Sequence, residues 1–483
     1  MIRTDMIGKP SAAEDAPQAI EEKFRLARLA QAQWRRTSLS QRVAALRGLW
    51  SEIDAARDEL AEVIREETGK TLTDAWGVEI DGAALLVKHY ARSAHRLLQE
   101  QAVPKPWLLI NKRAYIRYVP RGVVGLITPW NMPFLIPFGD AVCALLAGNA
   151  VVLKPSEWAT RTALYLEDRV RRSGIFPAEL LQVVQGGPKA GAAVADRSDM
   201  VLFTGSLAGG KDVAQRAAAR MIPAVLELGG KHPMIVARDA PLVRAVQAAL
   251  WGAYANCGQM CVGVQRIYVE RPAYEPFCEA LAEQLKTLRQ AAGGGFDTDI
   301  GRLMLPEQLE RIARQLEDAR ARGARVLGGA EVDRENLVLA PALILDAKPE
   351  MQVMREEAFG PVAAVMPVAR VEEAVALAND SPYGLAASVW TRDLRRGEEI
   401  AAALEAGTVG VNDLGTPYAV CGLPFGGIKA SGLGARHGDE GLRMFCWPQS
   451  VLVHEWSADG PDPWWFPYSR AKANFMRWLA RLS

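Results

Sequence analysis

The chain has 483 residues, 49% of them hydrophobic and 23% charged, so it is long enough to bury the cores of two or three domains. Lysine and arginine together number 57 and aspartate and glutamate 56, which leaves a formal charge of +1. A polyanion needs a strong positive field, so this composition argues against nucleic-acid binding and favours a small-molecule partner.

The six cysteines lack the CxxC spacings of a zinc site or a redox dithiol, and the five histidines form no ligand cluster, so we expect no metal site. No secretory segment follows Met1, and unpaired thiols in a long chain are typical of a reducing compartment. The expected location is therefore the cytoplasm. No run of roughly 18 apolar residues is present, which argues against a membrane-spanning helix.

The first part of the chain has the pattern of amphipathic helices. From Pro17 to about Gln101, apolar residues recur every three to four positions, as at Leu46, Leu49 and Ile53. Beyond two prolines, the segment from Trp107 to Tyr118 alternates β-branched and aromatic residues, which predicts a hairpin arm.

From Gly122 onward, short apolar runs alternate with helical segments. Near-continuous apolar runs are typical of parallel strands buried on both faces, and their alternation with helices predicts a doubly wound nucleotide-binding domain. The runs are GVVGLITPWN, NAVVLKPSE, LLQVVQGG and MVLFTGS. The alternation resumes after Gly230 with HPMIVAR, RIYVERP, ARVLGGA and AALEAGTVGVND, which predicts a second α/β domain.

The predicted fold class is therefore α/β, with a Rossmann-like cofactor domain, a second α/β catalytic domain and a β-hairpin oligomerisation arm. We expect the cofactor domain to comprise residues 1–103 and 121–228 and the catalytic domain residues 229–426. Residues 104–120 and 445–460 form the expected arm, and 461–483 form an aromatic and basic C-terminal tail.

Three residues are candidates for covalent chemistry. Cys261 lies in NCGQMCVGVQR, although a lone cysteine is more often a small buried hydrophobe. Glu227 precedes the glycine pair of LELGGK, where a carboxylate can act as a general base or serve only as a turn residue. Asn131 in TPWNMP follows an apolar strand, and its amide can stabilise an oxyanion or form an Asx turn.

Two segments have features of a cofactor site. Lys154 and Glu157 in VVLKPSE follow a strand, where ribose hydroxyls are typically bound. In FTGSLAGG, Gly205 and Gly210 bracket the start of a helix whose N–H groups can face a pyrophosphate. A plain Rossmann spacing would place the ribose-binding acid near Glu227, so two roles for Glu227 stay open.

Seven motifs in order resemble the aldehyde dehydrogenase superfamily from about Lys23 to Ser450: TPWNMP, KPSE, FTGSLAGG, LELGGK, GQMC, EEAFGP and PFGGIKASGLG. The resemblance implies that Cys261 attacks an aldehyde, that Asn131 and the Cys261 N–H hold the oxyanion, and that Glu227 activates water to hydrolyse the thioester. It further implies an NAD(P) site whose contacts are Thr128, Pro129, Trp130, Lys154, Ser156, Glu157, Gly205, Ser206, Gly210, Leu228, Glu357 and Phe359. Leu207 stands where the family often has threonine.

Several alternatives stay open. Glu157 favours NAD because it would repel a 2′-phosphate, but Lys154 beside it allows NADP. The apolar residues Met132, Ile136, Met260 and Val262 favour a medium aliphatic or aromatic aldehyde. Succinic semialdehyde is the alternative if an arginine enters the pocket, and a CoA-acylating reaction is the alternative if Glu227 is not a base. The remaining alternative is a protein of the same fold that is structural and has no enzymatic activity.

The arm predicts a homodimer or homotetramer, because exposed strand edges are usually covered. In the tail, Trp456, Trp464, Trp465 and Trp478 accompany a basic helix in which Phe475, Leu479 and Leu482 can share one face. We expect this helix to pack on the enzyme's own body or across a dimer. Contact with a membrane surface and shaping of the substrate entrance are the alternatives.

Overall fold

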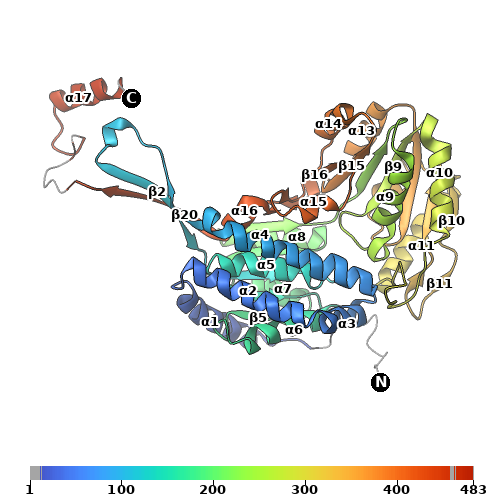
Figure 1. Cartoon of the computed structure of the whole chain (residues 1–483), viewed down its shortest axis with the longest axis horizontal. Coiled ribbons are helices and arrows are strands. Elements are labelled where there is room, and N and C mark those ends of the chain that lie inside the picture. The colour runs from blue at the N-terminus through green and yellow to red at the C-terminus, as the bar shows by residue number, and fades with distance from the viewer. Residues whose placement is uncertain (1–10, 12, 457–461, 463, 482–483) are drawn as a thin grey trace.

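The structure is a computed structural model that describes residues 11, 13–456, 462 and 464–481. Figure 1 shows a body of two α/β units and a slender arm that projects from it. Each unit has its own hydrophobic core around its own sheet.

The predicted helical layer is confirmed. Its apolar stripe explains why it packs: Phe24 and Trp34 are buried, and the Trp34 ring lies 5.2 Å from that of Phe176. The layer consists of α1 (Pro17–Trp34), α2 (Leu39–Ala55), α3 (Arg57–Thr68), a π-helix (Asp74–Ile80) and α4 (Asp81–Leu98).

The first sheet has six strands in the order β18-β7-β6-β3-β4-β5, and all its pairings except β18–β7 are parallel. β3 lies between β4 and β6, so the winding direction changes beside it, and the carboxyl ends of β3 and β6 border a topological switch point. The strands are β3 (Val123–Ile127), β4 (Ala150–Lys154), β5 (Leu181–Val183), β6 (Met200–Thr204), β7 (Ala224–Glu227) and β18 (Gly432–Leu433). The helices of this unit are α5 (Leu135–Leu146), α6 (Thr160–Arg172), α7 (Pro188–Ala195) and α8 (Leu207–Ala219).

The second sheet has seven strands in the order β10-β13-β14-β9-β8-β15-β16. Only the β10–β13 pairing in it is antiparallel. The strands are β8 (His232–Val236), β9 (Val264–Glu270), β10 (Arg325–Gly328), β13 (Ala342–Leu345), β14 (Val362–Val368), β15 (Ala386–Trp390) and β16 (Thr408–Val411). The accompanying helices are α9 (Leu242–Tyr254), α10 (Arg271–Leu285), α11 (Pro306–Ala321), α12 (Gln352–Arg355), α13 (Val371–Asn379), α14 (Leu394–Ala403) and α15 (Thr416–Ala419).

Short elements complete the body. β17 (Pro424–Phe425) pairs antiparallel with β19 (Arg436–His437), and this pairing places Phe425 opposite Arg436. α16 (Gly438–Arg443) follows, and β11 (Val332–Asp333) pairs with β12 (Val338–Leu339). The segment after β16 thus returns from the second unit to the first, where β18 joins the first sheet beside β7.

The arm is a three-stranded antiparallel sheet in the order β1-β2-β20. β1 (Gln101–Ala102) makes only two pairs with β2 (Lys112–Pro120), whereas β2 and β20 (Cys446–His454) pair along nine residues. Residues Trp107–Leu109 form a 3₁₀ turn, so the strand begins at Lys112 and not at Trp107 as the alternation predicted.

The tail helix, α17 (Arg470–Ala480), lies beyond the arm and away from the body (Figure 1). No residue of α17 is buried, so the expectation that this helix packs on the enzyme's own body is wrong for the described residues. Leu482, predicted to share its apolar face, lies outside the described residues. Within the described part of the chain, no helix is long and apolar enough to cross a membrane.

Candidate active site

A cavity of about 110 Å³ lies where the two units meet, and it contains all three residues predicted to carry the chemistry. Asn131 comes from the loop after β3, Glu227 from the end of β7 and Cys261 from the turn before β9. The fold thus brings Glu227 and Cys261, which follow Asn131 by 96 and 130 residues in the sequence, to the same cavity.

Cys261 is the one cysteine that is not fully buried, and all six lie in the described part of the chain. Burial of its sulfur raises the pKa of the thiol to about 12, and the charges of Glu227 and Glu357 act in the same direction. Arg436 and the Val262 N–H, which bonds the sulfur, lower it by less. The resting thiol is therefore protonated and needs a base before it can act as a nucleophile.

Glu227 is 3% exposed, and neither of its carboxylate oxygens has a hydrogen-bond partner within the described structure. Burial raises the pKa of Glu227 to about 8, against the attraction of Arg436 and with the repulsion of Asp140. A buried carboxylate with unpartnered oxygens beside a thiol can accept a proton from that thiol or from water. Two roles were predicted for Glu227, and its position in the same cavity as Cys261 favours the role of general base over that of ribose-binding acid.

The glycine pair after Glu227 lets the two units approach each other closely. A Cβ on Gly229 would lie 2.7 Å from Glu357 Oε2, and a Cβ on Gly230 would lie 2.5 Å from the carbonyl oxygen of Cys261. Gly230 also donates its N–H to Glu357 Oε1 at 3.1 Å. Any side chain at these two positions would push the thiol turn and the Glu357 loop away from β7.

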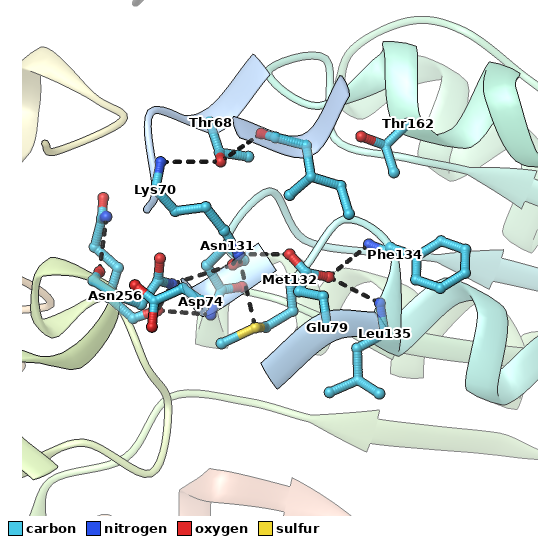
Figure 2. A network of polar contacts seen from close by, with 12 residues as sticks. Thr68, Lys70, Asp74, Glu79, Asn131, Met132, Phe134, Leu135, Thr162 and Asn256 are labelled. Atoms are coloured by element: carbon cyan, nitrogen blue, oxygen red, sulfur yellow. Dashed lines mark hydrogen bonds and ion pairs between the residues drawn. The ribbon is translucent and has the colours of Figure 1, made fainter. Parts of the chain in front are cut away.

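Asn131 is held through its side chain and its carbonyl group, and Figure 2 shows the contacts of the carbonyl with Lys70 and Asn256. Its Nδ2 donates to the Gln259 carbonyl at 2.9 Å, and its own carbonyl accepts from Lys70 Nζ at 2.9 Å and from Asn256 Nδ2 at 3.2 Å. An amide nitrogen carries two hydrogens, so one stays available for an oxyanion in the cavity.

Lys70 in turn is neutralised by Glu79, and both side chains are buried. The second Glu79 oxygen accepts the N–H groups of Phe134 and Leu135, each at 2.9 Å, at the start of α5 (Figure 2). The helical layer therefore fixes the Asn131 loop through one buried ion pair, which the sequence analysis did not detect.

Arg436 was also missed by the sequence analysis, although it is a charged residue in the cavity wall. Its side chain is buried, donates to Thr204 Oγ1 at 2.7 Å and lies 3.3 Å from Asp140. Burial opposes its charge, but Asp140 and Glu227 raise its pKa above the usual value, so it is a permanent cation beside Glu227. Asp140, the single acid in the apolar sequence LIPFGDAVCALL, was the signal for a buried cation.

The rest of the cavity wall is apolar. The four residues proposed to border the substrate path, Met132, Ile136, Met260 and Val262, all lie on it. They are joined by Val78, Leu135, Trp251, Leu385, Tyr418 and Phe425, which the sequence analysis did not identify. His232 lies outside this wall, where its ring nitrogens bond the Val262 carbonyl and the Ser388 hydroxyl, and burial lowers its pKa to about 4. This histidine is a structural residue.

The candidate cofactor residues lie at the carboxyl ends of the first sheet, at the switch point. Lys154 ends β4, is buried, and contacts Glu157 at 3.2 Å. Ser206 caps α8 by accepting the Gly209 N–H, which leaves the N–H groups of the first turn at Leu207 and Ala208 for a phosphate. Such a donor set fits a dinucleotide, with a ribose near Glu157 and the pyrophosphate at α8.

Gly210 does not face that site. Its N–H bonds the Ser206 carbonyl inside α8, and a Cβ there would lie 2.5 Å from the Leu228 side chain, so the glycine serves helix–strand packing. Leu228 lines the Cys261 cavity. The Ser156 hydroxyl accepts the Trp158 N–H and stabilises the turn after β4.

The predicted nicotinamide end brings residues from both units together. The Trp130 and Phe359 rings meet edge to face with centroids 5.4 Å apart. Glu357 lies two residues from Phe359 and is tied to Gly230, and burial raises its pKa. The Thr128 hydroxyl is buried and has no hydrogen-bond partner among the residues that the structure describes, and a bound ligand can satisfy such a group. Pro129 follows it at the half-buried rim.

Comparison with known proteins finds similar chains over almost the whole length. The family model described as the aldehyde dehydrogenase family matches residues 3–451. The 4,4'-diapolycopene aldehyde oxidase of Methylomonas sp is 40% identical over 455 residues, which are 94% of this chain and 85% of the relative. A protein of Mycolicibacterium smegmatis, provisionally named a succinate-semialdehyde dehydrogenase using NADP(+), is 38% identical over 447 residues, with 91% and 85% covered.

Solved structures are similar as well. The crystal structure of betaine aldehyde dehydrogenase from Staphylococcus aureus in complex with NAD+ matches with a TM-score of 0.87 and 30% identity. The match covers 94% of this chain and 90% of that one, so the two sheets and the arm described above share their arrangement with an NAD+-bound protein.

Proposed function

The chain belongs to the aldehyde dehydrogenase family, and on this premise we propose that it oxidises an aldehyde to the carboxylic acid through a covalent intermediate on Cys261. The observation that carries the proposal is the convergence of Cys261, Glu227 and Asn131 on one cavity. In this proposal the unit built on β3–β7 binds the nicotinamide cofactor, and the unit built on β8–β16 supplies the nucleophile.

Addition to the aldehyde is the first step. Because its pKa is raised, the Cys261 thiol gives up its proton to a base as its sulfur bonds to the carbonyl carbon, and Glu227 is the carboxylate in the same cavity. The carbonyl oxygen becomes an oxyanion beside Asn131 Nδ2. One such donor is worth about 3–4 kcal/mol of transition-state stabilisation.

Oxidation then converts the thiohemiacetal into a thioester. Trp130 and Glu357 would hold the nicotinamide, which would supply the hydride acceptor for this step. The chain's own contribution is to hold the carbon that loses the hydride, through the sulfur of Cys261 and the amide of Asn131, in a fixed position.

Hydrolysis completes the cycle. Glu227 first passes the proton it took from Cys261 to solvent and then takes a proton from water, whose oxygen attacks the thioester carbon. The C–S bond breaks, the acid leaves, and the Cys261 thiolate takes the proton from Glu227 to return to the resting thiol. A cavity of about 110 Å³ has room for water, since one buried water molecule needs about 10–15 Å³ of such space. Glu227 at this position supports hydrolysis over transfer of the acyl group to coenzyme A.

The substrate class that fits this wall is a medium aliphatic or aromatic aldehyde, because most of the lining residues are apolar. The Mycolicibacterium relative keeps succinic semialdehyde as a second candidate, and an arginine does enter the cavity. Arg436 is, however, already paired with Asp140 at 3.3 Å, so the carboxylate of succinic semialdehyde would compete with Asp140 for one cation. This charge balance favours the apolar aldehyde.

For the cofactor we propose NAD over NADP. Glu157 lies 27% exposed at the carboxyl edge of the sheet, where a carboxylate binds the ribose 2′-hydroxyl and repels a 2′-phosphate. The NAD+ complex of the Staphylococcus protein supports this choice, and the NADP(+) in the Mycolicibacterium name opposes it. Glu157→Ser should shift the ratio of kcat/KM values toward NADP if Glu157 sets the preference. An unchanged ratio would remove that role.

The compartment we propose is the cytoplasm, since all six cysteines are free and unpaired thiols are typical of a reducing compartment.

A spectrophotometric panel of aldehydes with NAD and NADP tests the reaction. Cys261→Ala should abolish reduction of the cofactor, whereas Cys278→Ala, a matched change at a buried cysteine in α10, should keep it. Glu227→Gln removes the base for both steps, so it should give a slowed burst of at most one equivalent of reduced cofactor and then stall. Sustained turnover by Cys261→Ala would overturn the proposal.

A further inference from the structure

The C-terminal tail, residues 464–481, has a formed helix that the described part of the chain leaves exposed. Ser469 caps α17 by accepting the Lys472 N–H, and Lys472 Nζ donates to the Trp465 carbonyl at 2.9 Å. The helix is therefore stabilised locally. Yet none of its residues is buried, and Figure 1 shows it beyond the end of the arm.

The two faces of α17 differ sharply. Phe475, Trp478 and Leu479 share one face by their spacing of three and four residues, and Trp478 is 55% exposed. Arg470, Arg477 and Arg481, spaced by seven and four, share the opposite face. Between residues 469 and 481 the sequence has four basic side chains and no acidic one.

Further aromatic side chains are exposed at the base of the helix. Trp465, Phe466 and Tyr468 are 55%, 74% and 69% exposed, and the Phe466 and Tyr468 rings lie 4.4 Å apart. Such rings have an apolar body and, in tryptophan and tyrosine, a polar edge, and they are enriched where hydrocarbon meets water.

The base of the tail is held on the arm, so the exposed surface has a fixed attachment point. Asp462 accepts from Lys112 Nζ at 2.8 Å, and both side chains are buried. Lys112 also contacts His454 Nδ1 at 2.8 Å and lies 6.0 Å from the centre of the Trp464 ring. The link joins β2, β20 and the tail at the end of the arm that is far from the body.

We propose that the tail docks on an anionic lipid bilayer, with α17 lying in the plane of the interface. An aromatic face opposite an arginine face, on a helix with no acidic residue, is the composition of interfacial helices. The 11 residues of α17 are too few to span a bilayer, which takes about 20. Negative headgroups would neutralise the arginines while the acyl region covers Phe475 and Trp478.

A second copy of the chain is the competing occupant, and the charges disfavour a contact between two α17 helices. A two-fold contact between two α17 helices would place like surfaces together, each with four cations and no acid of its own to oppose them. An anionic bilayer matches both faces of one helix at the same time.

Co-sedimentation of the full chain with vesicles tests the proposal. We expect binding to vesicles of phosphatidylcholine with phosphatidylglycerol, at least tenfold weaker binding to phosphatidylcholine alone, and a loss of binding as salt is raised. Arg470→Glu/Arg477→Glu should abolish the preference for anionic vesicles. Arg35→Glu/Arg36→Glu, the same charge change at exposed residues after α1, should leave it unchanged.

The apolar face has its own pair of variants. Phe475→Ser/Trp478→Ser should reduce binding at least tenfold, whereas Val243→Ser/Leu394→Ser, at exposed apolar residues of the body, should not. Equal binding to both kinds of vesicle, or no binding, would overturn the proposal. A lower oligomer mass in light scattering for the tail variants without any vesicle binding would overturn it in favour of a second copy. These assays contain no aldehyde, so they are independent of the proposed reaction.

Discussion

Glu227 gives the active site a predicted pH dependence. Its pKa is raised to about 8 by burial, so at neutral pH most of this carboxylate is protonated and cannot accept a proton. The ionised form accumulates as pH rises through that value. We expect the rate of thioester hydrolysis to increase with pH, with a midpoint near 8, in single-turnover assays of acyl-enzyme decay. A rate that is flat between pH 6 and about 9 would exclude Glu227 as the base.

Arg436 is predicted to set that midpoint. It is the cation that lowers the pKa of Glu227 against the effect of burial, so its removal should raise that pKa further and move the midpoint to higher pH. We expect Arg436→Met to shift the profile upward and Arg436→Lys, which keeps the charge, to stay near the wild type. Because Asp140 loses its partner, Arg436→Met should also lose about 3–5 kcal/mol of stability.

The pH profile distinguishes the electrostatic role of Arg436 from a structural one. Asp140→Asn disturbs the same ion pair, but it removes a charge that raises the pKa of Glu227, so its midpoint should move down. A shift in the same direction for Arg436→Met and Asp140→Asn would contradict the assignment.

The residues with proposed catalytic roles could be predicted from sequence because each lies in a short motif where a strand or turn ends. Cys261, Glu227 and Asn131 all reach the cavity that the motifs implied. Arg436 could not be predicted in this way, because its position depends on the pairing of β19 with β17 and on Asp140, 296 residues earlier in the chain.

Among the elements, the helical layer contacts a residue with a proposed catalytic role in addition to packing on the sheet. Its amphipathic pattern is local, so the helices were predictable, but the contact between Lys70 and the Asn131 carbonyl spans 61 residues and depends on tertiary structure. Tertiary structure also decides the position of α17. The basic and aromatic composition of this helix was visible in the sequence, but its distance from the body was not.

The Lys70–Glu79 pair is predicted to stabilise the fold and to position Asn131. Lys70→Met leaves the buried Glu79 without a cation, which should lower the free energy of unfolding by about 3–5 kcal/mol and should lower kcat. Lys70→Met/Glu79→Gln removes the uncompensated charge, and the amide oxygen that replaces the carboxylate can still accept from the N–H groups of Phe134 and Leu135. We expect urea unfolding to show recovered stability in this double variant.

Activity of the same double variant separates the two effects. Asn131 loses the Lys70 contact in both variants, so kcat should stay reduced, by up to about 10²-fold, when stability has recovered. Recovery of kcat together with stability would mean that the pair acts on the fold alone.

At the scale of the whole molecule, the two sheets were predictable because buried parallel strands are continuous apolar runs that alternate with helices. The arm was only partly predictable. The alternation between Trp107 and Tyr118 indicated a strand, but the main partner of β2 is β20, more than 320 residues later, and only the fold brings them together.

The arm also leads to the prediction of a symmetric oligomer. β20 is the outer strand of its sheet, nine residues long, and Leu452 on it is 60% exposed. A long exposed edge with an apolar side chain is unfavourable in a monomer, because its unpaired N–H and carbonyl groups invite another chain to pair. We therefore expect the wild type to be a homodimer or homotetramer in light scattering. Leu452→Lys, which places a charge on that edge, should lower the mass, whereas Leu394→Lys on α14 should not; a monomeric wild type would refute the prediction.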